Sequence, residues 1–353
     1  MSKRNGGRTM KKVAIGLSGG VDSAAAARLL LEKGCEVTGI ILRLKPGELA
    51  DADIEDARRI AAKLGIELKV LDRRELFRKR VIEPFAAEYL AARTPNPCVE
   101  CNSAVKFGAM LDYALEIGCD GIATGHYAKI EESGGRYLLK RSASVKDQSY
   151  FLWRLTQFQL AHAIFPLEGA EKSEIRKIAE NADLPVAKKS DSQEICFVPD
   201  NDYSAYLASL GVSSPAGNFV DGDGRVIGTH SGIINYTIGQ RKGLGAFGKP
   251  MFVVGINASD NTVILGENGS QYSRGLIADR LNFIAFDRLE APMRAAVKIR
   301  SRAGEQAAEI IPLGDKMKII FDEPQRSVTP GQSAVIYDGD TVIGGGRIIE
   351  AIK

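Results

Sequence analysis

Several residue types that would identify common classes of protein are scarce in this chain. Its 353 residues contain three histidines, one tryptophan and an odd number of cysteines, five. So few histidines leave little room for a histidine-based zinc enzyme, and the sequence has no HExxH motif. An odd cysteine count does not fit the paired disulfides of a small secreted protein, so we expect a reducing, cytoplasmic setting.

Long apolar runs and a strong net charge are also lacking. No run approaches the roughly 20 apolar residues that span a bilayer, so we expect no membrane association. The basic segment at residues 1–12 is not followed by an apolar stretch, and we interpret it as a mobile tail rather than a secretory signal. The formal charge is only +3, from 47 basic and 44 acidic side chains. Affinity for nucleic acid would therefore have to come from local clusters of charge.

The first half of the chain alternates short apolar runs with helical periodicity. The runs at 13–18, 37–44, 67–72 and 120–126 have the composition of buried strands, and helical patterns cover 22–33, 74–93 and 102–117. We expect a kink at Pro84. This alternation predicts an α/β domain over residues 1–165, with a parallel sheet and helices on both faces. Ligands of such sheets lie beyond the carboxyl ends of the strands.

The second half has a different texture. Residues 166–215 are polar and mostly helical in pattern, and we expect them to form a small central helical domain that carries Cys196 in a strand-like EICFV. From 216 to 353, turn signals about every 8 to 12 residues separate short alternating runs, which predicts a C-terminal β-barrel.

One stretch of this predicted barrel is basic on alternate positions. In a strand, Val297 and Ile299 would face the core, and the basic side chains would share the other face: Arg294, Lys298, Arg300 and Arg302. A solvated face and a phosphate-binding face both fit this pattern.

The turn after the first strand, SGGVDS at residues 18–23, is suited to phosphate. Two adjacent glycines allow a tight turn that directs several backbone N–H groups into one concavity, at the positive end of the following helix. Ser18 and Ser23 add hydroxyl donors, and Asp22 either caps the helix or meets Mg²⁺. The GxxxxGK[ST] pattern is absent, which disfavours kinase or GTPase chemistry. A GxGxxG at 243–248 follows no strand, and we interpret it as a flexible loop.

The cysteines divide into two groups. Cys35 and Cys119 each follow a glycine at a predicted helix end, and we assign both to burial. Cys98 and Cys101 lie in TPNPCVECN, where two prolines stiffen the approach, and Cys196 follows about 95 residues later. A closed zinc site needs four ligands, and only these three cysteines are candidates.

Several long motifs, distributed from about Val13 to the C-terminus, resemble those of one family. They are GLSGGVDS, TPNPCVECN, ATGHYA, KDQSYFL, SEIRKIAE, TIGQRKGLG and FDEPQRSVTPGQSAV. The chain is similar to the tRNA-specific 2-thiouridylases (MnmA family), which belong to the PP-loop ATP pyrophosphatases. The resemblance implies ATP-dependent 2-thiolation of the tRNA wobble uridine, in which the C2 oxygen attacks the α-phosphate and sulfur then attacks C2.

The resemblance also implies site residues and partners. ATP, with Mg²⁺, would bind at Gly16, Leu17, Ser18, Gly19, Gly20, Val21, Asp22, Ser23, Leu42 and Gly125. Cys101 matches the catalytic nucleophile, and Cys196 matches the carrier of a persulfide from a sulfur-relay protein or a cysteine desulfurase. The RNA would be a tRNA for lysine, glutamate or glutamine.

Contacts with tRNA would come from three parts of the chain. The resemblance assigns them to Asn96, Pro97, Cys98, His126, Lys146, Asp147, Gln148, Arg300, Ser301 and Gln332. Judged from the residues alone, His126 is better explained as a structural residue at a strand end.

The sequence departs from the family at Cys98, where an aspartate is common, so that CxxC replaces DxxC. Cys98, Cys101 and Cys196 then form a catalytic trio whose thiolates suit a 4Fe-4S cluster with one open iron. Because related tRNA-thiolating PP-loop enzymes use such a cluster, we favour cluster-borne sulfur over a persulfide relay.

Two other functions compete with thiolation. An amide- or guanidino-forming PP-loop synthetase acting on a small molecule would not need the three cysteines. An RNA-binding protein with a degenerate nucleotide loop is disfavoured because SGGVDS is intact.

Overall fold

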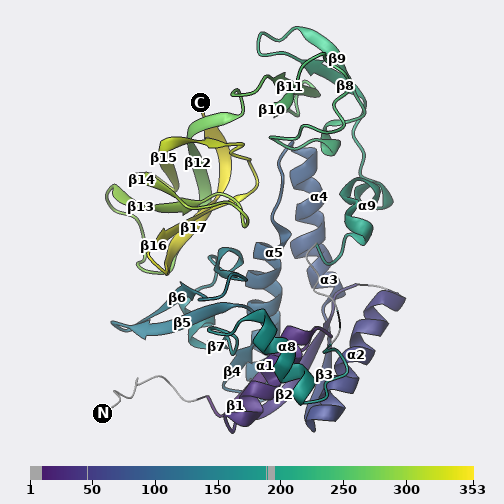
Figure 1. The fold of residues 1–353 in the computed structure, drawn as a ribbon, viewed down its shortest axis with the longest axis vertical. Coiled ribbons are helices and arrows are strands. Elements are labelled where there is room, and N and C mark those ends of the chain that lie inside the picture. The colour runs from purple at the N-terminus through teal and green to yellow at the C-terminus, as the bar shows by residue number, and fades with distance from the viewer. Residues whose placement is uncertain (1–9, 46, 188, 190–194) are drawn as a thin grey trace. The chain divides into compact units, whose positions relative to one another are not determined.

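The computed structural model describes residues 10–45, 47–187, 189 and 195–353. The chain divides into two compact units (Figure 1). The first contains residues up to 80, 98–193 and 340–343, and the second contains 81–97, 194–339 and 344–353. Most of the predicted tail, residues 1–9, lies outside the described residues, and Lys12 already belongs to the first strand.

A parallel sheet forms the centre of the first unit, as predicted. Its order is β3 (Glu67–Asp72), β2 (Glu36–Arg43), β1 (Lys12–Gly16), β4 (Gly121–Ala123) and β7 (Ala163–Ile164). Every neighbouring pair is parallel. In the central strand, Val13 and Ile15 are fully buried, which explains why this run is continuously apolar.

Helices cover the sheet on both faces. One face shares a hydrophobic core with α1 (Val21–Glu32), α2 (Glu48–Leu64) and α8 (Lys172–Asn181). Right-handed crossovers lead to the other face. After α5 (Pro97–Glu100), the first-unit helices η2 (Cys101–Met110) and α6 (Leu111–Glu116) cover it, with the side chain of Met110 against Gly16 of β1.

The helical pattern at 74–93 forms three consecutive pieces. They are α3 (Arg74–Phe77), a π-helical turn η1 (Arg78–Ile82) and α4 (Glu83–Leu90). Pro84 has no N–H to donate to the preceding turn, and the wider π turn comes directly before it. The expected kink is therefore a π turn, and the division between the two units falls inside it.

The expected central helical domain is wrong. α8 packs into the core of the first unit through Ile175 and Ala179, because its apolar face is buried against α1. In the second unit, α9 (Tyr203–Ser209) is followed by a mixed sheet of β10 (Phe252–Asn257), β11 (Thr262–Gly266), β8 (Gly217–Val220) and β9 (Val226–His230). Within it β11 and β8 are parallel, and the other pairs are antiparallel.

The strand expected at EICFV is also absent, because the described part of this segment, Ile195–Val198, forms turns. The side chains of Phe197 and Val198 are both buried. Tertiary packing, rather than strand pairing, therefore explains why this segment is apolar.

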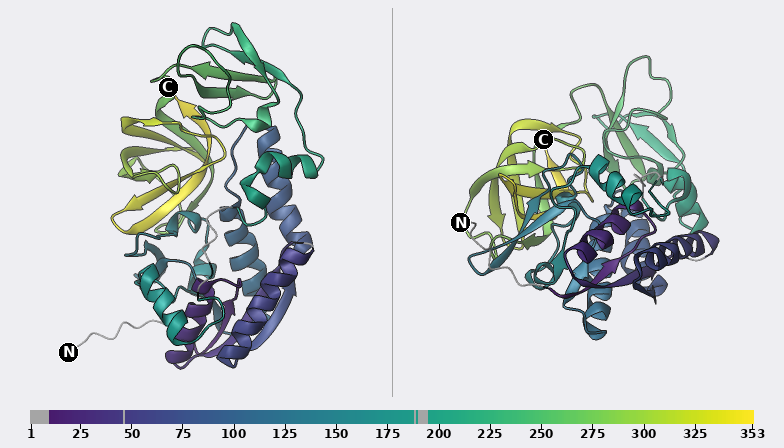
Figure 2. Two further views of the ribbon diagram at one scale, coloured as in Figure 1. Left: turned by 45° about the vertical axis from the view of Figure 1, so that its right-hand side comes forward. Right: turned by 60° about the horizontal axis from the view of Figure 1, so that its bottom comes forward.

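A closed β-barrel ends the chain, as predicted (Figure 2). Its strands are ordered β12 (Tyr272–Phe283), β15 (Lys316–Arg326), β14 (Gln306–Leu313), β13 (Met293–Lys298), β16 (Ser333–Asp338) and β17 (Thr341–Ile352), and β12 pairs with β17 to close it. Alternate residues such as Ile310, Met317 and Ile319 fill the interior. The barrel is smaller than predicted, because residues 217–266 form the separate mixed sheet.

Short elements complete the two units. In the first, β5 (Ala128–Ser133) and β6 (Arg136–Arg141) form a hairpin, and the start of β17 pairs with β6 at Thr341 and Val342. The remaining pieces are η3 (Ser149–Phe151), α7 (Gln157–Ala161), η4 (Pro199–Asn201) and η5 (Ile233–Asn235). Among the described residues, none of the helices has both the length and the apolar composition needed to span a bilayer.

Candidate functional site

The glycine turn joins β1 to α1 at the carboxyl edge of the sheet. Gly19 has a φ of +70°, and Gly20 is the N-cap of α1 without a side-chain hydrogen bond to the helix. Ser23 Oγ donates to the carbonyl of Gly20 at 3.0 Å and lies 3.2 Å from Ser18 Oγ. The first-turn N–H groups of α1 are thus not capped by a side chain, as an anion site at a helix N-terminus requires.

Asp22 does not cap the helix, so one of its two predicted roles is wrong. Its Oδ1 accepts hydrogen bonds from the Tyr127 hydroxyl and from the Lys172 ammonium, both at 2.7 Å. The Lys172 side chain is only 15% exposed. A lysine from α8 therefore neutralises the carboxylate beside the phosphate-binding turn, which favours the approach of a polyanion.

Both outlying residues of the predicted ATP site lie at this same edge of the sheet. A Cβ placed on Gly125, just after β4, would lie 2.9 Å from the carbonyl carbon of Asp22 and from the nitrogen of Ser23. Leu42 is near the end of β2, two residues beyond the partner of Gly16. The structure thus brings Gly125 against the turn and places Leu42 on the neighbouring strand.

A second lysine contacts the glycine turn. Lys189 Nζ donates to the Gly19 carbonyl at 3.0 Å and to Asp56 Oδ2 at 2.7 Å. Burial alone would raise the pKa of Asp56, but hydrogen bonds from Lys189 and Arg59 outweigh it, so this pKa is lowered. Asp56 is therefore a carboxylate that holds Lys189 beside the turn.

Cys98 and Cys101 lie on consecutive helical turns in the first unit. Cys98 is exposed on α5, and Cys101, buried, begins the π-helix η2. The next residue, Asn102, is 2% exposed, and its Oδ1 has no hydrogen-bond partner among the described residues. π-helical segments and unsatisfied buried acceptors both occur preferentially at functional sites.

Cys196 is exposed on a turn of the second unit, next to a residue that packs against aromatic rings. The next residue, Phe197, packs edge-on against Phe85 with ring centroids 5.2 Å apart, and against Tyr206 at 5.5 Å. Most of the preceding stretch, residues 188 and 190–194, lies outside the described residues.

His126 is buried between aromatic rings. Its Nδ1 lies 2.8 Å from Thr124 Oγ1, and the rings of Phe107 and Phe165 are about 6 Å away. Burial, and next the charge of Lys106, lower the pKa of His126 well below the usual value. These surroundings are those of the structural residue that the sequence alone favours.

Two residues of the KDQ motif at 146–148 stabilise the loop that contains them. Asp147 accepts hydrogen bonds from the amides of Ser142 and Ser149, and Gln148 accepts one from the Tyr127 amide at 3.0 Å. Lys146 is exposed. Of the three, Lys146 has the surroundings that a contact with RNA requires.

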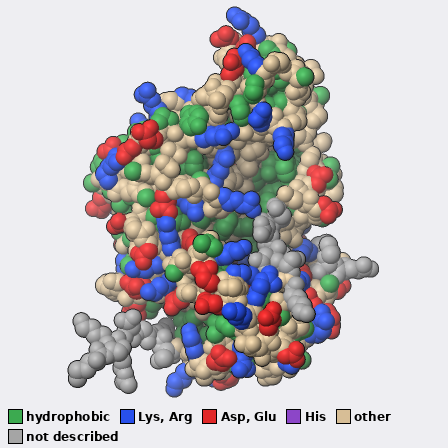
Figure 3. Space-filling view, viewed as in Figure 1, with side chains coloured by type: hydrophobic (Ala, Val, Ile, Leu, Met, Phe, Trp, Pro, Cys, Tyr) green, Lys and Arg blue, Asp and Glu red, His purple; other side chains and the backbone are tan. Residues whose placement is uncertain are grey.

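The predicted face of basic side chains on the barrel is less uniform than their alternate spacing in the sequence suggests. Val297 and Ile299 are buried, as predicted, but Arg294 is paired with Asp322 at 2.5 Å. Figure 3 shows acidic side chains interspersed with basic ones on the visible face. Arg300 Nη2 donates to the Ser327 carbonyl at 2.5 Å and to Thr329 Oγ1 at 2.7 Å. Ser301 follows it in a turn and is partly exposed.

Gln332 contacts the chain just before Cys98. Its Nε2 donates to the carbonyls of Thr94 at 3.0 Å and Pro95 at 3.2 Å. Asn96 is partly exposed and Pro97 is buried at the start of α5.

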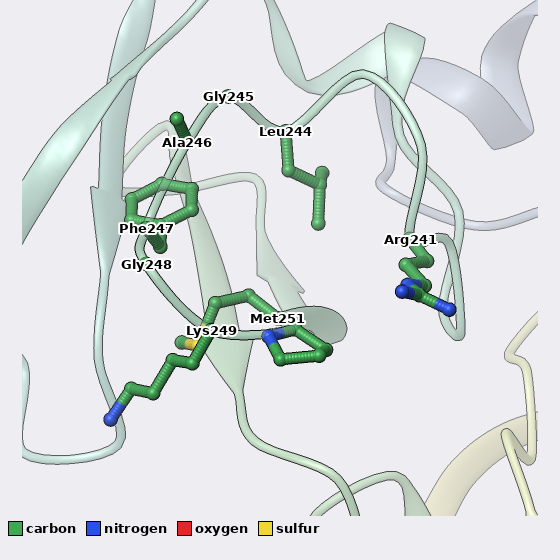
Figure 4. A pocket seen from close by; sticks show the side chains of 9 residues that line it. Arg241, Leu244, Gly245, Ala246, Phe247, Gly248, Lys249 and Met251 are labelled. Carbon is green, nitrogen blue, oxygen red and sulfur yellow. The ribbon is translucent and has the colours of Figure 1, made fainter.

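The glycine-rich loop at 241–251 surrounds a hollow of its own. It has a volume of about 370 Å³, with Leu244, Phe247 and Met251 among its lining (Figure 4). No strand leads into a helix here, which agrees with the interpretation of GxGxxG as a loop rather than a dinucleotide site.

The three predicted metal ligands are divided between the units. Cys98 and Cys101 belong to the first unit and Cys196 to the second. Over the described residues, neither unit contains a group of three or more His, Cys, Asp or Glu side chains that could hold a metal ion.

Three family models match successive parts of the chain. Residues 11–200 match the family model described as tRNA methyl transferase HUP domain, residues 204–267 the tRNA methyl transferase PRC-barrel domain, and residues 273–348 the aminomethyltransferase beta-barrel domain. The tRNA-specific 2-thiouridylase MnmA of Clostridioides difficile (strain 630) is 50% identical, with 97% of this chain and 99% of that protein covered. The protein of the same name from Acetivibrio thermocellus is 50% identical over 96% of this chain and 99% of the relative.

The fold and the glycine turn define a PP-loop ATP-binding protein with a PRC-barrel-like middle domain and a C-terminal β-barrel. Because the identity with its relatives extends over nearly the whole chain, the protein belongs to the family of tRNA-specific 2-thiouridylases.

Sequence reasoning missed the residues that contact the site from far along the chain. Lys172 and Lys189 lie 150 and 170 positions from their partners Asp22 and Gly19. Neither lysine lies in the motifs given above for the family resemblance, although Lys172 directly precedes SEIRKIAE. A lysine in a predicted helix usually indicates a solvated face, so no local pattern distinguishes these two.

Proposed function

We propose that this chain catalyses ATP-dependent 2-thiolation of the tRNA wobble uridine by the adenylation route. The C2 oxygen of the uridine attacks the α-phosphate of ATP, pyrophosphate leaves, and C2 becomes an activated carbon with AMP as its leaving group. Sulfur then attacks C2 and AMP departs. The glycine turn at Gly16–Ser23 would hold the phosphates, Leu42 and Gly125 would line the adenine side, and the lysines would balance the charge.

One observation carries this proposal. The helix η2 begins at Cys101 and ends at Met110, whose side chain packs against Gly16, the last residue of β1 before the glycine turn. A single element of the first unit thus joins the proposed sulfur chemistry to the proposed ATP site.

Mg²⁺ fits this site as a companion of ATP. It prefers oxygen ligands and usually binds through one or two carboxylates together with substrate phosphates and water. Asp22 is the carboxylate next to the turn, and in the described structure its Oδ1 binds Lys172 and Tyr127. Asp22 would hold Mg²⁺, which would neutralise phosphate charge.

For the sulfur step we propose a persulfide on Cys196, supplied by a sulfur-relay protein or a cysteine desulfurase. Its terminal sulfur attacks C2 and displaces AMP. The Cys101 thiolate then attacks Cys196 Sγ, which breaks the bond to the transferred sulfur, leaves 2-thiouridine and forms a Cys101–Cys196 disulfide. Two electrons from a thiol reductant restore both cysteines. The exposure of Cys196 supports its loading by a donor.

The alternative is sulfur carried by a 4Fe-4S cluster on Cys98, Cys101 and Cys196, whose thiolates suit such a cluster. We derive no step through a cluster. Iron and sulfide analysis after anaerobic purification tests it: stoichiometric iron that is lost with Cys98→Ala would replace the persulfide model.

The tRNA contacts and the setting remain part of the proposal. Exposed Lys146, with Asn96 and Ser301, has the accessibility for RNA contact, and tRNAs for lysine, glutamate and glutamine are the proposed substrates. The proposed setting is a reducing cytoplasm, because an odd number of cysteines does not fit a framework of paired disulfides.

One assay tests the function. The full chain is incubated with ATP, Mg²⁺, a cysteine desulfurase with cysteine, a thiol reductant and unmodified tRNA, and AMP and 2-thiouridine are measured together. We expect equal amounts of both, and no 2-thiouridine from Cys101→Ser. AMP formed without tRNA would indicate a small-molecule synthetase, and neither product would indicate a binding protein.

A further inference from the structure

The approach segment, which we define as Thr94–Pro97, leads directly into Cys98. Pro95 and Pro97 have fixed φ angles, and the residues before them, Thr94 and Asn96, are restricted to extended conformations. The segment is therefore stiff. A stiff segment transmits the position of its first residues to its last, so whatever fixes Thr94 also orients the chain that enters α5 at Pro97.

A turn of the C-terminal barrel fixes those first residues. The 330–332 turn (Pro330, Gly331 and Gln332) lies in the second unit together with Thr94 and Pro95. The Thr94 amide donates to the Pro330 carbonyl at 2.9 Å, and Gln332 Nε2 donates to the carbonyls of Thr94 and Pro95. Three hydrogen bonds from one turn thus define the backbone of two successive residues.

Gly331 allows this close approach. A Cβ on Gly331 would lie 2.7 Å from the Thr94 oxygen and 2.9 Å from the Thr94 nitrogen, both backbone atoms, and its φ is +94°. A side chain at position 331 would therefore displace Thr94 as well as strain the turn.

The turn itself is fixed on both sides. Gly331 N donates to the Ile348 carbonyl and Ile348 N donates to the Gln332 carbonyl, both at 2.8 Å, which ties the turn to β17. On its other side, Arg300 binds the residues just before the turn, Ser327 and Thr329. The Thr94 hydroxyl also lies 3.3 Å from the Thr237 hydroxyl.

We propose that Gly331 and Gln332 are positioning residues for the thiolation site: the 330–332 turn sets the approach segment, which contains Asn96 and Pro97 and leads into Cys98. The inference rests on the proposed function for its catalytic consequence. It assigns Gln332 a role within the chain, in place of the tRNA contact that the family resemblance implies, and gives the barrel a role in placing Asn96 and Pro97.

The test uses full-length Gln332→Glu and Gly331→Ala. Gln332→Glu keeps the size of the side chain but replaces the donor with oxygens that repel the two carbonyls. We expect the kcat for 2-thiouridine formation to fall at least about tenfold in both variants, because small misplacements of reacting groups are costly. The dissociation constant for tRNA should stay within about twofold of wild type, and the Thr94 amide should exchange with deuterium faster.

Two matched controls separate positioning from general damage. Gln306→Glu makes the same charge change on the barrel strand β14, and Gly314→Ala places a Cβ at a φ of +62° with no atom within 4 Å. Both should retain the wild-type kcat. Weaker tRNA binding with an unchanged kcat at saturating tRNA would overturn the proposal, as would equal behaviour of Gly331→Ala and Gly314→Ala. If wild type formed no 2-thiouridine, the proposed function would fail, while the exchange rate of Thr94 would still decide whether the turn fixes the segment.

Discussion

The glycine turn and the approach segment reach a defined geometry by different means. Gly16–Ser23 forms a turn largely from its own sequence: adjacent glycines, a helix start and two serines that contact each other. Thr94–Pro97 is stiff by composition, but its position is set by the 330–332 turn, more than 230 residues later, since the contacts of Gln332 span 238 and 237 positions. A local turn can be recognised in the sequence, whereas a segment positioned from a distance cannot.

The comparison is not absolute, because the glycine turn also depends on distant residues. Gly125 leaves room for Asp22 and Ser23, and Lys172 neutralises Asp22. The local sequence therefore defines the shape of the turn, and the rest of the fold provides its space and its charge balance.

Gly125→Ala should have the largest effect. Gly125 has no positive φ, so the added methyl acts by contact alone, and at 2.9 Å from backbone atoms of Asp22 and Ser23 it must displace the turn. We expect tRNA-dependent AMP formation to fall about 100-fold. The control is Gly169→Ala, where a Cβ meets no atom within 4 Å. Wild-type activity of Gly125→Ala would mean that the turn is independent of the rest of the fold.

The sequence predicted the elements whose patterns are local. The parallel sheet, the C-terminal barrel and the glycine turn follow from apolar runs, turn residues and adjacent glycines. The helical domain at 166–215 was wrong because α8 has an amphipathic pattern that does not specify its partner, and that partner is α1. The strand predicted for EICFV was wrong because Phe197 is buried by packing against aromatic rings rather than in a sheet.

The sequence predicted only those parts of the site that lie within one short motif. Gly16–Ser23 and the two cysteines of CVEC stand out by residue type and spacing. Lys172, Lys189 and Gly331 do not, because an ordinary lysine or turn glycine has the same local sequence whether or not it contacts a distant loop.

Arg347→Met tests the ion pairs that precede the approach segment. Arg347 contacts Glu88 at 2.7 Å and Asp279 at 2.7 Å, and Glu88 also binds Arg93, the residue before Thr94. The Arg347 side chain is 18% exposed. Without Arg347, the Asp279 carboxylate, which is only 22% exposed, loses its ion-pair partner. We therefore expect the free energy of unfolding to fall by about 2 kcal/mol. Denaturant titration measures this change.

A surface pair provides the control for Arg347. Arg288 and Glu290 are paired at 3.0 Å with side chains more than 70% exposed, so Arg288→Met should change stability by less than about 0.5 kcal/mol. Similar losses in the two variants would mean that the ion pairs before Thr94 contribute no more than an ordinary surface pair.

Lys172→Met should have an intermediate effect on ATP. Without the ammonium, the Asp22 carboxylate would repel the triphosphate, so we expect the KM for ATP to rise about tenfold, which corresponds to about 1.4 kcal/mol. The contribution should depend on the partner, so a double-mutant cycle with Asp22→Asn should show non-additive free energies. Additive effects would indicate that Lys172 acts independently of Asp22.

His126 should have the smallest effect, and one that depends on pH. Burial, followed by the charge of Lys106, lowers the pKa of His126, so the folded protein binds fewer protons here than the unfolded chain does. Its neutral form favours folding above the unfolded pKa of about 6.5, and this stability is lost as the pH falls below that value, by up to about 1.4 kcal/mol per pH unit. Between pH 6.5 and 5.5 we expect wild type to lose about 1 kcal/mol more stability than His126→Gln. Urea titrations of both proteins at the two pH values measure the difference, and parallel losses would indicate that the ring takes up a proton inside the folded protein without cost.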